Sequence, residues 1–144
     1  MKIIYFTFML TLISCSKPFD EKKGAIFANN FLEKVKNTQH KDILQSCSKK
    51  FFEITSKKDL SKYLINDDEK LGKLKSYRLK YTSGAILVNE DFHEYVYTYI
   101  CTYEKKPDST IVKILLVNEP YSDNIKVYGY HIYDDTLLRN SESN

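Results

Sequence analysis

EYVYTYICTYE, the stretch from Glu94 to Glu104, carries the clearest strand pattern in the chain. Its tyrosines and Cys101 occupy alternate positions, and valine, threonine and isoleucine occupy most of the positions between them. Successive side chains of a strand point to opposite faces of a sheet, and aromatic and β-branched residues favour strands. Both faces of this segment carry bulky side chains. The pattern therefore predicts a central strand with a neighbour on each side.

Three other segments with a period of two predict further strands, at about residues 75–88, 110–117 and 125–133. Polar turn residues separate all four segments, so consecutive strands are expected to pair as hairpins. Within the first of them, Ser83-Gly84 indicates a bend or a bulge.

Apolar residues at three- and four-residue spacing predict helices at about residues 20–37, 42–52 and 56–71. Asp20 is suited to cap the first helix, Ser56 and Asp59 resemble a capping box, and Gly72 is suited to end the third. Helices followed by hairpin-connected strands predict an α+β fold. About three N-terminal helices are expected to pack on one face of a four-stranded antiparallel sheet.

The first 15 residues have the pattern of an export signal: Lys2, an apolar run from Ile3 to Ile13, and then Ser14-Cys15. The apolar run is shorter than the roughly 20 residues that span a bilayer, and it has the size of a signal-peptide core. Leu12-Ile13-Ser14-Cys15 resembles the lipobox of bacterial lipoproteins. The resemblance implies that the signal is cleaved before Cys15 and that the Cys15 residue carries lipid, including palmitate. It also implies that the protein is located at the bacterial cell envelope.

The organisation that we expect has four parts. Residues 1–14 form a lipoprotein signal peptide, residues 15–19 a tether, residues 20–134 a single α+β domain, and residues 135–144 a flexible tail.

Composition argues against several classes of site. The formal net charge is +3, and lysines and acidic residues are interspersed, unlike the basic stripes of nucleic-acid binders. The four glycines are not clustered, so no phosphate-binding loop is predicted. The histidines and cysteines lack metal-ligand spacing, and the acidic runs at Asp67–Glu69 and Asp134-Asp135 are better explained as solvated turns than as calcium sites. We expect no metal and no cofactor.

Two segments, Leu71–Leu79 (LGKLKSYRL) and Val127–Ile132 (VYGYHI), are similar to segments of small exported domains. Those domains belong to the nuclear-transport-factor-2-like superfamily, a cystatin-like cone of curved sheet wrapped on helices. The resemblance implies that Val96, Ile100 and Thr102 face the helices. Tyr97, Tyr99 and Tyr103 would then face away from them, as a candidate binding face.

The resemblance leaves function open, because this superfamily includes isomerases, dehydratases and non-catalytic binders. An enzyme of this kind needs a buried carboxylate or histidine inside the cone. Asp91, Glu94 and Glu104 are expected at strand ends, and His131 is the histidine inside a predicted strand. A histidine on a strand is more often structural, so His131 is a weak site candidate.

We therefore expect a lipid-anchored, non-catalytic domain that binds a partner protein, a small ligand or a second copy of itself. A partner protein or a second copy would bind through the sheet face. The alternatives are a small envelope enzyme with a site inside the cone and an immunity or inhibitor lipoprotein.

Cys47 and Cys101 remain in the mature chain. Cys47 is expected to face the sheet from the second helix, whereas Cys101 shares the face of the tyrosines. Residues on opposite sides of a sheet cannot meet the geometry of a disulfide. We therefore predict no bridge, with Cys47 buried and Cys101 a partly exposed thiol.

Overall fold

The computed structural model describes residues 19–86, 93–119 and 124–134. Its helices come first and its strands follow. They are α1 (Glu21–Lys36), α2 (His40–Ser46), α3 (Lys49–Ile54), α4 (Lys57–Leu71), β1 (Leu74–Ile86), β2 (His93–Tyr103), β3 (Thr110–Asn118) and β4 (Ile125–Asp134).

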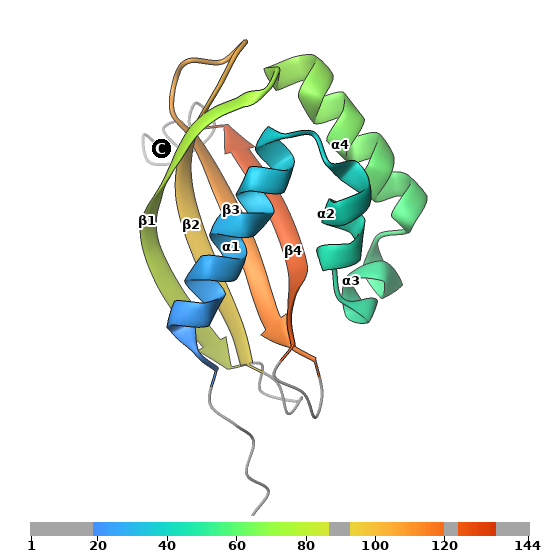
Figure 1. The fold of residues 1–144 in the computed structure, drawn as a ribbon, viewed down its shortest axis with the longest axis vertical. Helices are drawn as coiled ribbons and strands as arrows, with labels where there is room; N and C mark the ends of the chain where they lie inside the picture. Colours follow the sequence, from blue (N-terminus) through green and yellow to red (C-terminus); the bar gives the residue numbers. More distant parts are fainter. Residues whose placement is uncertain (1–18, 87–92, 120–123, 135–144) are drawn as a thin grey trace, which may run out of the picture.

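The strands form one antiparallel sheet in the order β1-β2-β3-β4, so each strand pairs with its neighbours in sequence. Figure 1 shows that the sheet is curved and that α1, α2, α3 and α4 all lie on the same side of it. The predicted α+β class is confirmed, and β2 has the predicted interior position.

The segment expected to form one helix at residues 42–52 is divided into α2 and α3. Cys47 between them is extended and forms a parallel bridge with Val127, where the Ser48 amide donates to the Val127 carbonyl at 2.8 Å. The Ser48 hydroxyl then accepts from the Phe51 amide at 3.1 Å and caps α3. A contact with the edge of β4 thus interrupts the helix, which apolar spacing alone does not predict.

The bulge expected at Ser83-Gly84 is absent from the described ladder. Ser83 pairs with Val96 and Gly84 with Tyr95 in regular register. The register of β1 shifts instead next to Leu74 and between Leu79 and Tyr81. A Cβ at Gly84 would lie 3.2 Å from the Tyr95 ring, which is a tight contact.

The predicted orientation of β2 is wrong. Tyr97 and Tyr99 are 0 % exposed and Tyr103 is 4 % exposed, all within the core beneath the helices. The Tyr97 hydroxyl donates to the Glu21 carbonyl oxygen, and the Tyr99 hydroxyl donates to Asn29 Oδ1, both at 2.8 Å. Because α1 supplies these acceptors, the rings can be buried without losing their polar interactions. These three tyrosines do not form an exposed binding face.

Cys101 lies on this same inner face and is 0 % exposed, so the prediction of a partly exposed thiol is wrong as well. Cys47 is buried in the same core, as predicted, and both are free thiols. Their expected separation by the sheet is incorrect. Burial raises the pKa of each thiol to about 12, which makes both unreactive near neutral pH.

Candidate functional site

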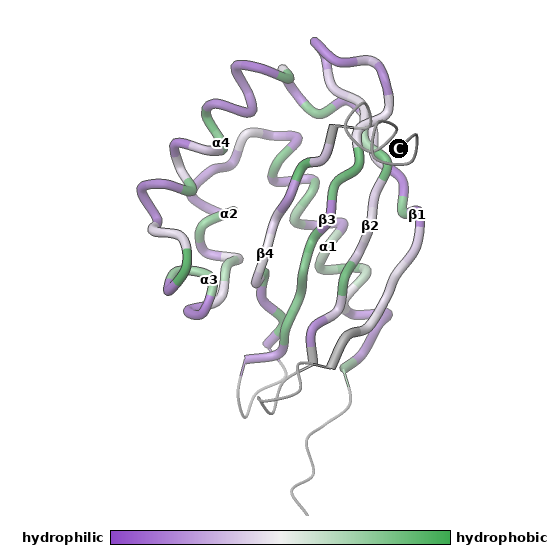
Figure 2. The backbone as a smooth tube through the Cα atoms, turned by 180° about the vertical axis from the view of Figure 1, so that it is seen from behind, coloured by the Kyte–Doolittle hydropathy of each residue, from purple (hydrophilic) through white to green (hydrophobic). Residues whose placement is uncertain are grey.

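The sheet face that points away from the helices, here called the outer face, is not covered by any described helix or strand. Figure 2 views the molecule from this side, with the strands in front of α1. Because Tyr97, Tyr99 and Cys101 point inward, the residues between them point outward. Val96 and Ile100 on β2 and Leu115 on β3 are half-buried there.

Two tyrosines flank this apolar centre. Tyr81 on β1 is 48 % exposed, and Tyr133 on β4 is 37 % exposed. In register, Tyr81 pairs with Thr98, and Tyr133 pairs with Ile111. The Thr98 hydroxyl is buried among these neighbours without a hydrogen-bond partner. The outer face thus combines aliphatic, aromatic and a few polar groups across all four strands.

The charged groups near the centre of the outer face are cationic. Lys113 lies opposite His131, and its ammonium nitrogen lies 5.0 Å from the centroid of the Tyr133 ring. Arg78 lies opposite Ile100. Burial and the charge of Lys113 lower the pKa of His131, so its imidazole is neutral at pH 7. At one end of the face, Glu94 is 8 % exposed, and burial raises its pKa.

The structure places His131 on this outer face, beside Tyr133, with ring centroids 6.1 Å apart. It lies outside the layer between helices and sheet, where a catalytic base was expected. Glu104 is also unsuited to that role, because Lys75 lies 3.0 Å from its carboxylate and its pKa is lowered by that contact. Asp91 and Cys15 lie outside the described residues.

A polar cluster that the sequence did not predict lies between α4 and the sheet. Asp67 on α4 has a buried carboxylate oxygen, Oδ2, without a hydrogen-bond partner. Its negative charge contributes to raising the pKa of Tyr63 on the same helix and of Tyr103 and Tyr130 on the sheet. The hydroxyl of Tyr103 lies next to that of Tyr130, yet makes no hydrogen bond of good geometry. Desolvation raises the pKa of Asp67 to about 6.

The sequence does contain a signal for this cluster. Tyr63 and Leu64 lie three and four residues after Leu60, and Asp67 lies four and three residues after them, so all four share one stripe of a helix. Leu60 and Leu64 are buried, and Asp67 continues the stripe inward. The predicted solvated acidic turn at Asp67–Glu69 is wrong, because these residues lie in α4. Three adjacent acidic residues suggest a solvated turn, but on a helix only Asp67 of the three lies on the same side as Leu60 and Leu64. Asp68, one position on, instead pairs with His40 at 2.9 Å.

Within the described ranges, no group of three or more His, Cys, Asp or Glu residues is arranged to hold a metal ion. The same part of the chain has no helix with the length and apolar character needed to cross a bilayer.

Comparisons with protein-family models, with curated proteins and with solved structures found no match for this chain. The similarity to nuclear-transport-factor-2-like domains therefore stays a prediction.

Proposed function

We propose that this chain is a lipid-anchored, non-catalytic domain that binds a partner protein at the bacterial cell envelope through its outer face. The observation that carries the proposal is a sheet surface free of described covering elements, with a half-buried aliphatic centre, two exposed tyrosines and cations near that centre. Contiguous apolar patches of this kind are typical of interaction sites.

The side chains match what protein interfaces use. Interface centres are enriched in tyrosine and arginine, and they are depleted in acidic residues and lysine. Tyr81, Tyr133, Ile100 and Leu115 supply the apolar contact area. Lys113 departs from the pattern, but its ammonium group lies over the Tyr133 ring.

The charge of the outer face favours a partner of a different sequence. The cation Lys113 lies in one middle row of the sheet, and the cation Arg78 lies in the next row of pairs. A symmetric pair of copies would bring the same surface patch together, and hence like charges. A partner with acidic residues around an apolar centre would complement this face instead. We therefore favour a heterologous, acidic partner over a homodimer.

The lipid anchor is supported by the pattern of residues 2–15, in which an apolar segment precedes Cys15. Stable anchoring needs more than one acyl chain, as a multiply acylated cysteine would provide. Cys15→Ala should move the protein from the membrane fraction to the soluble fraction or leave its signal uncut. A variant that stays lipidated and membrane-bound would contradict the anchor.

Partner binding is tested by photo-crosslinking in the cell. A benzoylphenylalanine replaces Tyr133 on the outer face or, as control, Ile65 on α4, which is 49 % exposed. We expect one defined adduct with another protein from position 133 and none from 65. The adduct should disappear when Lys113→Glu is added. An adduct between two copies of this chain, or one that survives Lys113→Glu, would contradict an acidic partner at this face.

The cluster at Asp67 supports a second candidate, an isomerase or dehydratase with its site between α4 and the sheet. A partly buried carboxylate with a raised pKa beside tyrosine hydroxyls has the composition of an acid–base pair. Any such activity of the purified chain should fall by about 100-fold or more in Asp67→Asn. An activity that Asp67→Asn leaves unchanged would exclude this cluster as its site.

A further inference from the structure

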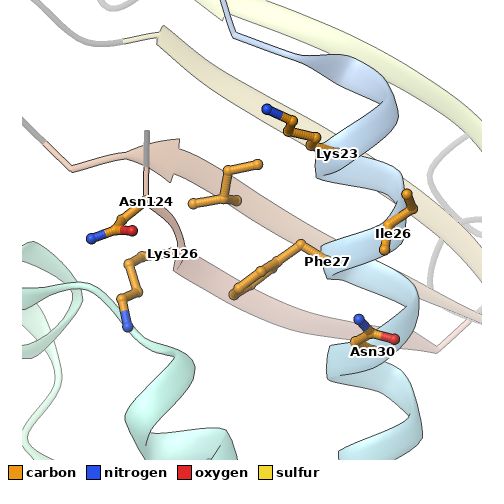
Figure 3. A pocket seen from close by; sticks show the side chains of 7 residues that line it. Lys23, Ile26, Phe27, Asn30, Asn124 and Lys126 are labelled. Carbon is orange, nitrogen blue, oxygen red and sulfur yellow. The ribbon is translucent and has the colours of Figure 1, made fainter. Parts of the chain in front are cut away.

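A groove of about 490 Å³ lies between α1 and the first residues of β4. Its apolar walls come from Ile26, Phe27 and Ile125, and its polar rim comes from Lys23, Asn30, Asn124 and Lys126. Figure 3 shows Phe27 pointing from α1 towards β4, with Lys23 and Lys126 on either side. The volume falls within the usual range for sites that hold small organic ligands, about 300–1,000 Å³.

Both ionic side chains of the groove are cations, and their positions are restrained. The Lys126 ammonium group donates to the Gln45 carbonyl oxygen at 3.0 Å. This neutral acceptor fixes the ammonium group without cancelling its charge. Lys23 lies 3.9 Å from an oxygen of Asp20, a long contact between largely exposed side chains that does little to neutralise it. The electrostatics therefore favour an anion.

The apolar walls favour an anion that carries a hydrocarbon part. Ile26 is 61 % exposed although it lies beside Phe27 on the groove. A free phosphate ion would bind the lysines and leave this apolar surface in water. An amphipathic anion would cover it, since burying apolar area is favourable.

The groove lies at the end of the domain where the chain enters α1. Phe19 stacks on Tyr95 of β2, with ring centroids 3.9 Å apart, and α1 begins two residues later. Figure 1 shows that α1 begins at the end of the sheet where β4 also begins. If Cys15 carries lipid, the four residues from Cys15 to Phe19 place this end within about 14 Å of the bilayer.

We infer that the groove binds an anionic phospholipid of the membrane. The phosphate group lies between Lys23 and Lys126, and the first carbons of the acyl chain lie against Ile26, Phe27 and Ile125. This inference rests on the proposed lipid anchor for the proximity of the bilayer, and it is independent of the outer face. Binding here would hold the groove end of the domain against the membrane and leave the outer face accessible.

The test uses residues 16–144, which lack the lipidated cysteine and contain the eight helices and strands that the structure describes. Because no anchor is present, failure of this inference is distinguishable from failure of the anchor. The chain is sedimented with vesicles of phosphatidylethanolamine and phosphatidylglycerol at 7:3 (about 30 % anionic lipid) or of pure phosphatidylcholine. We expect binding to the anionic vesicles alone. Lys126→Gln should weaken it by about fivefold, the effect of roughly one lysine near an anionic surface. Ile26→Ser should weaken it by about threefold through lost apolar contact.

Matched controls lie on α4. Lys62→Gln and Ile65→Ser change an exposed lysine and an exposed isoleucine there and should leave vesicle binding unchanged. Circular dichroism checks that each variant is folded. Equal binding to phosphatidylcholine, or equal losses in the α4 variants, would overturn the inference.

A second measurement identifies the site and the source of the anion. Soluble dihexanoyl-phosphatidylglycerol should shift the NMR signals of the Ile26 methyl groups and the Asn30 side-chain amide. Inorganic phosphate at the same concentration should not. Equal shifts with phosphate would show a general anion site and would contradict a lipid ligand, as would lipid-induced shifts confined to residues outside the groove.

Discussion

At the scale of single residues, Gly24 shows how closely α1 approaches β2. A Cβ at this position would overlap the Tyr97 hydroxyl and would lie 2.7 Å from the Phe19 ring. The glycine thus allows Tyr97 to reach the Glu21 carbonyl oxygen. In the sequence, Gly24 reads only as a residue that weakens the first turn of a helix. Its role depends on a partner more than 70 residues away, which no local pattern contains.

Gly24→Ala should therefore destabilise the domain, although alanine is the better helix former by about 1 kcal/mol. Overpacking of a tight contact costs about 1–3 kcal/mol, and here it meets the first turn of α1 and the Tyr97 hydroxyl. Urea unfolding measures the change. Adding Tyr97→Phe removes the overlapping hydroxyl, so the double variant should lose less than the sum of the two single losses. A Gly24→Ala variant as stable as the parent would contradict this packing.

Asp67 should make stability depend on pH. Its folded pKa is raised from 3.8 to about 6, so between these values the folded state binds more protons than the unfolded state. The free energy of unfolding should then fall as pH rises from about 4 to 6. The stabilisation that Asp67 provides as a neutral acid is present at low pH and is lost through pH 6.

Asp67→Asn should remove this dependence. At pH 7.5 it should raise the free energy of unfolding by about 1 kcal/mol, a value discounted for the half-exposed carboxyl, and near pH 4 it should change little. Glu69→Gln, on the exposed side of α4, is the matched control and should be close to neutral at both values. Equal effects of Asp67→Asn at pH 4 and pH 7.5 would show that folding does not raise the pKa of Asp67.

At the scale of elements, the period of two located the four strands, and apolar spacing located α1 and α4. These patterns arise from local geometry, so the sequence is sufficient to find them. The inward face of β2 could not be found in the same way, because both of its faces carry bulky side chains. The tyrosine face of β2 points inward because α1 supplies hydrogen-bond acceptors for its hydroxyls, namely the Glu21 carbonyl and the Asn29 side chain. The outer face was therefore identified only after the sheet and α1 were seen together.

Adjacent residues of β2 should respond very differently to truncation. Tyr99→Ala should cost about 3–5 kcal/mol, as for other buried aromatic side chains, because its ring is 0 % exposed and its hydroxyl binds Asn29. Ile100→Ala, on the half-exposed outer face, should cost clearly less. Guanidinium unfolding of both variants measures the difference. A larger loss for Ile100→Ala would mean that the assigned faces are reversed.

At the scale of the whole molecule, the helices cover one face of the sheet and leave the other for contact. The groove lies on the helical side, at the end where the chain enters, whereas the outer face lies across the sheet from it. Membrane contact and partner binding would therefore use separate surfaces. A substitution that abolishes membrane contact should leave partner binding intact, and a substitution that abolishes partner binding should leave membrane contact intact.

Partner binding through the outer face requires that solvent reaches Ile100 and Leu115 in the folded chain, and NMR with a soluble paramagnetic probe measures this. The methyl groups of Ile100 and Leu115 should be strongly attenuated, as should those of Ile65 on the surface of α4. The methyl groups of Ile114 and Leu116, both 0 % exposed, should be unaffected. Protection of Ile100 and Leu115 equal to that of Ile114 and Leu116 would show that the outer face is closed to a partner in the folded chain.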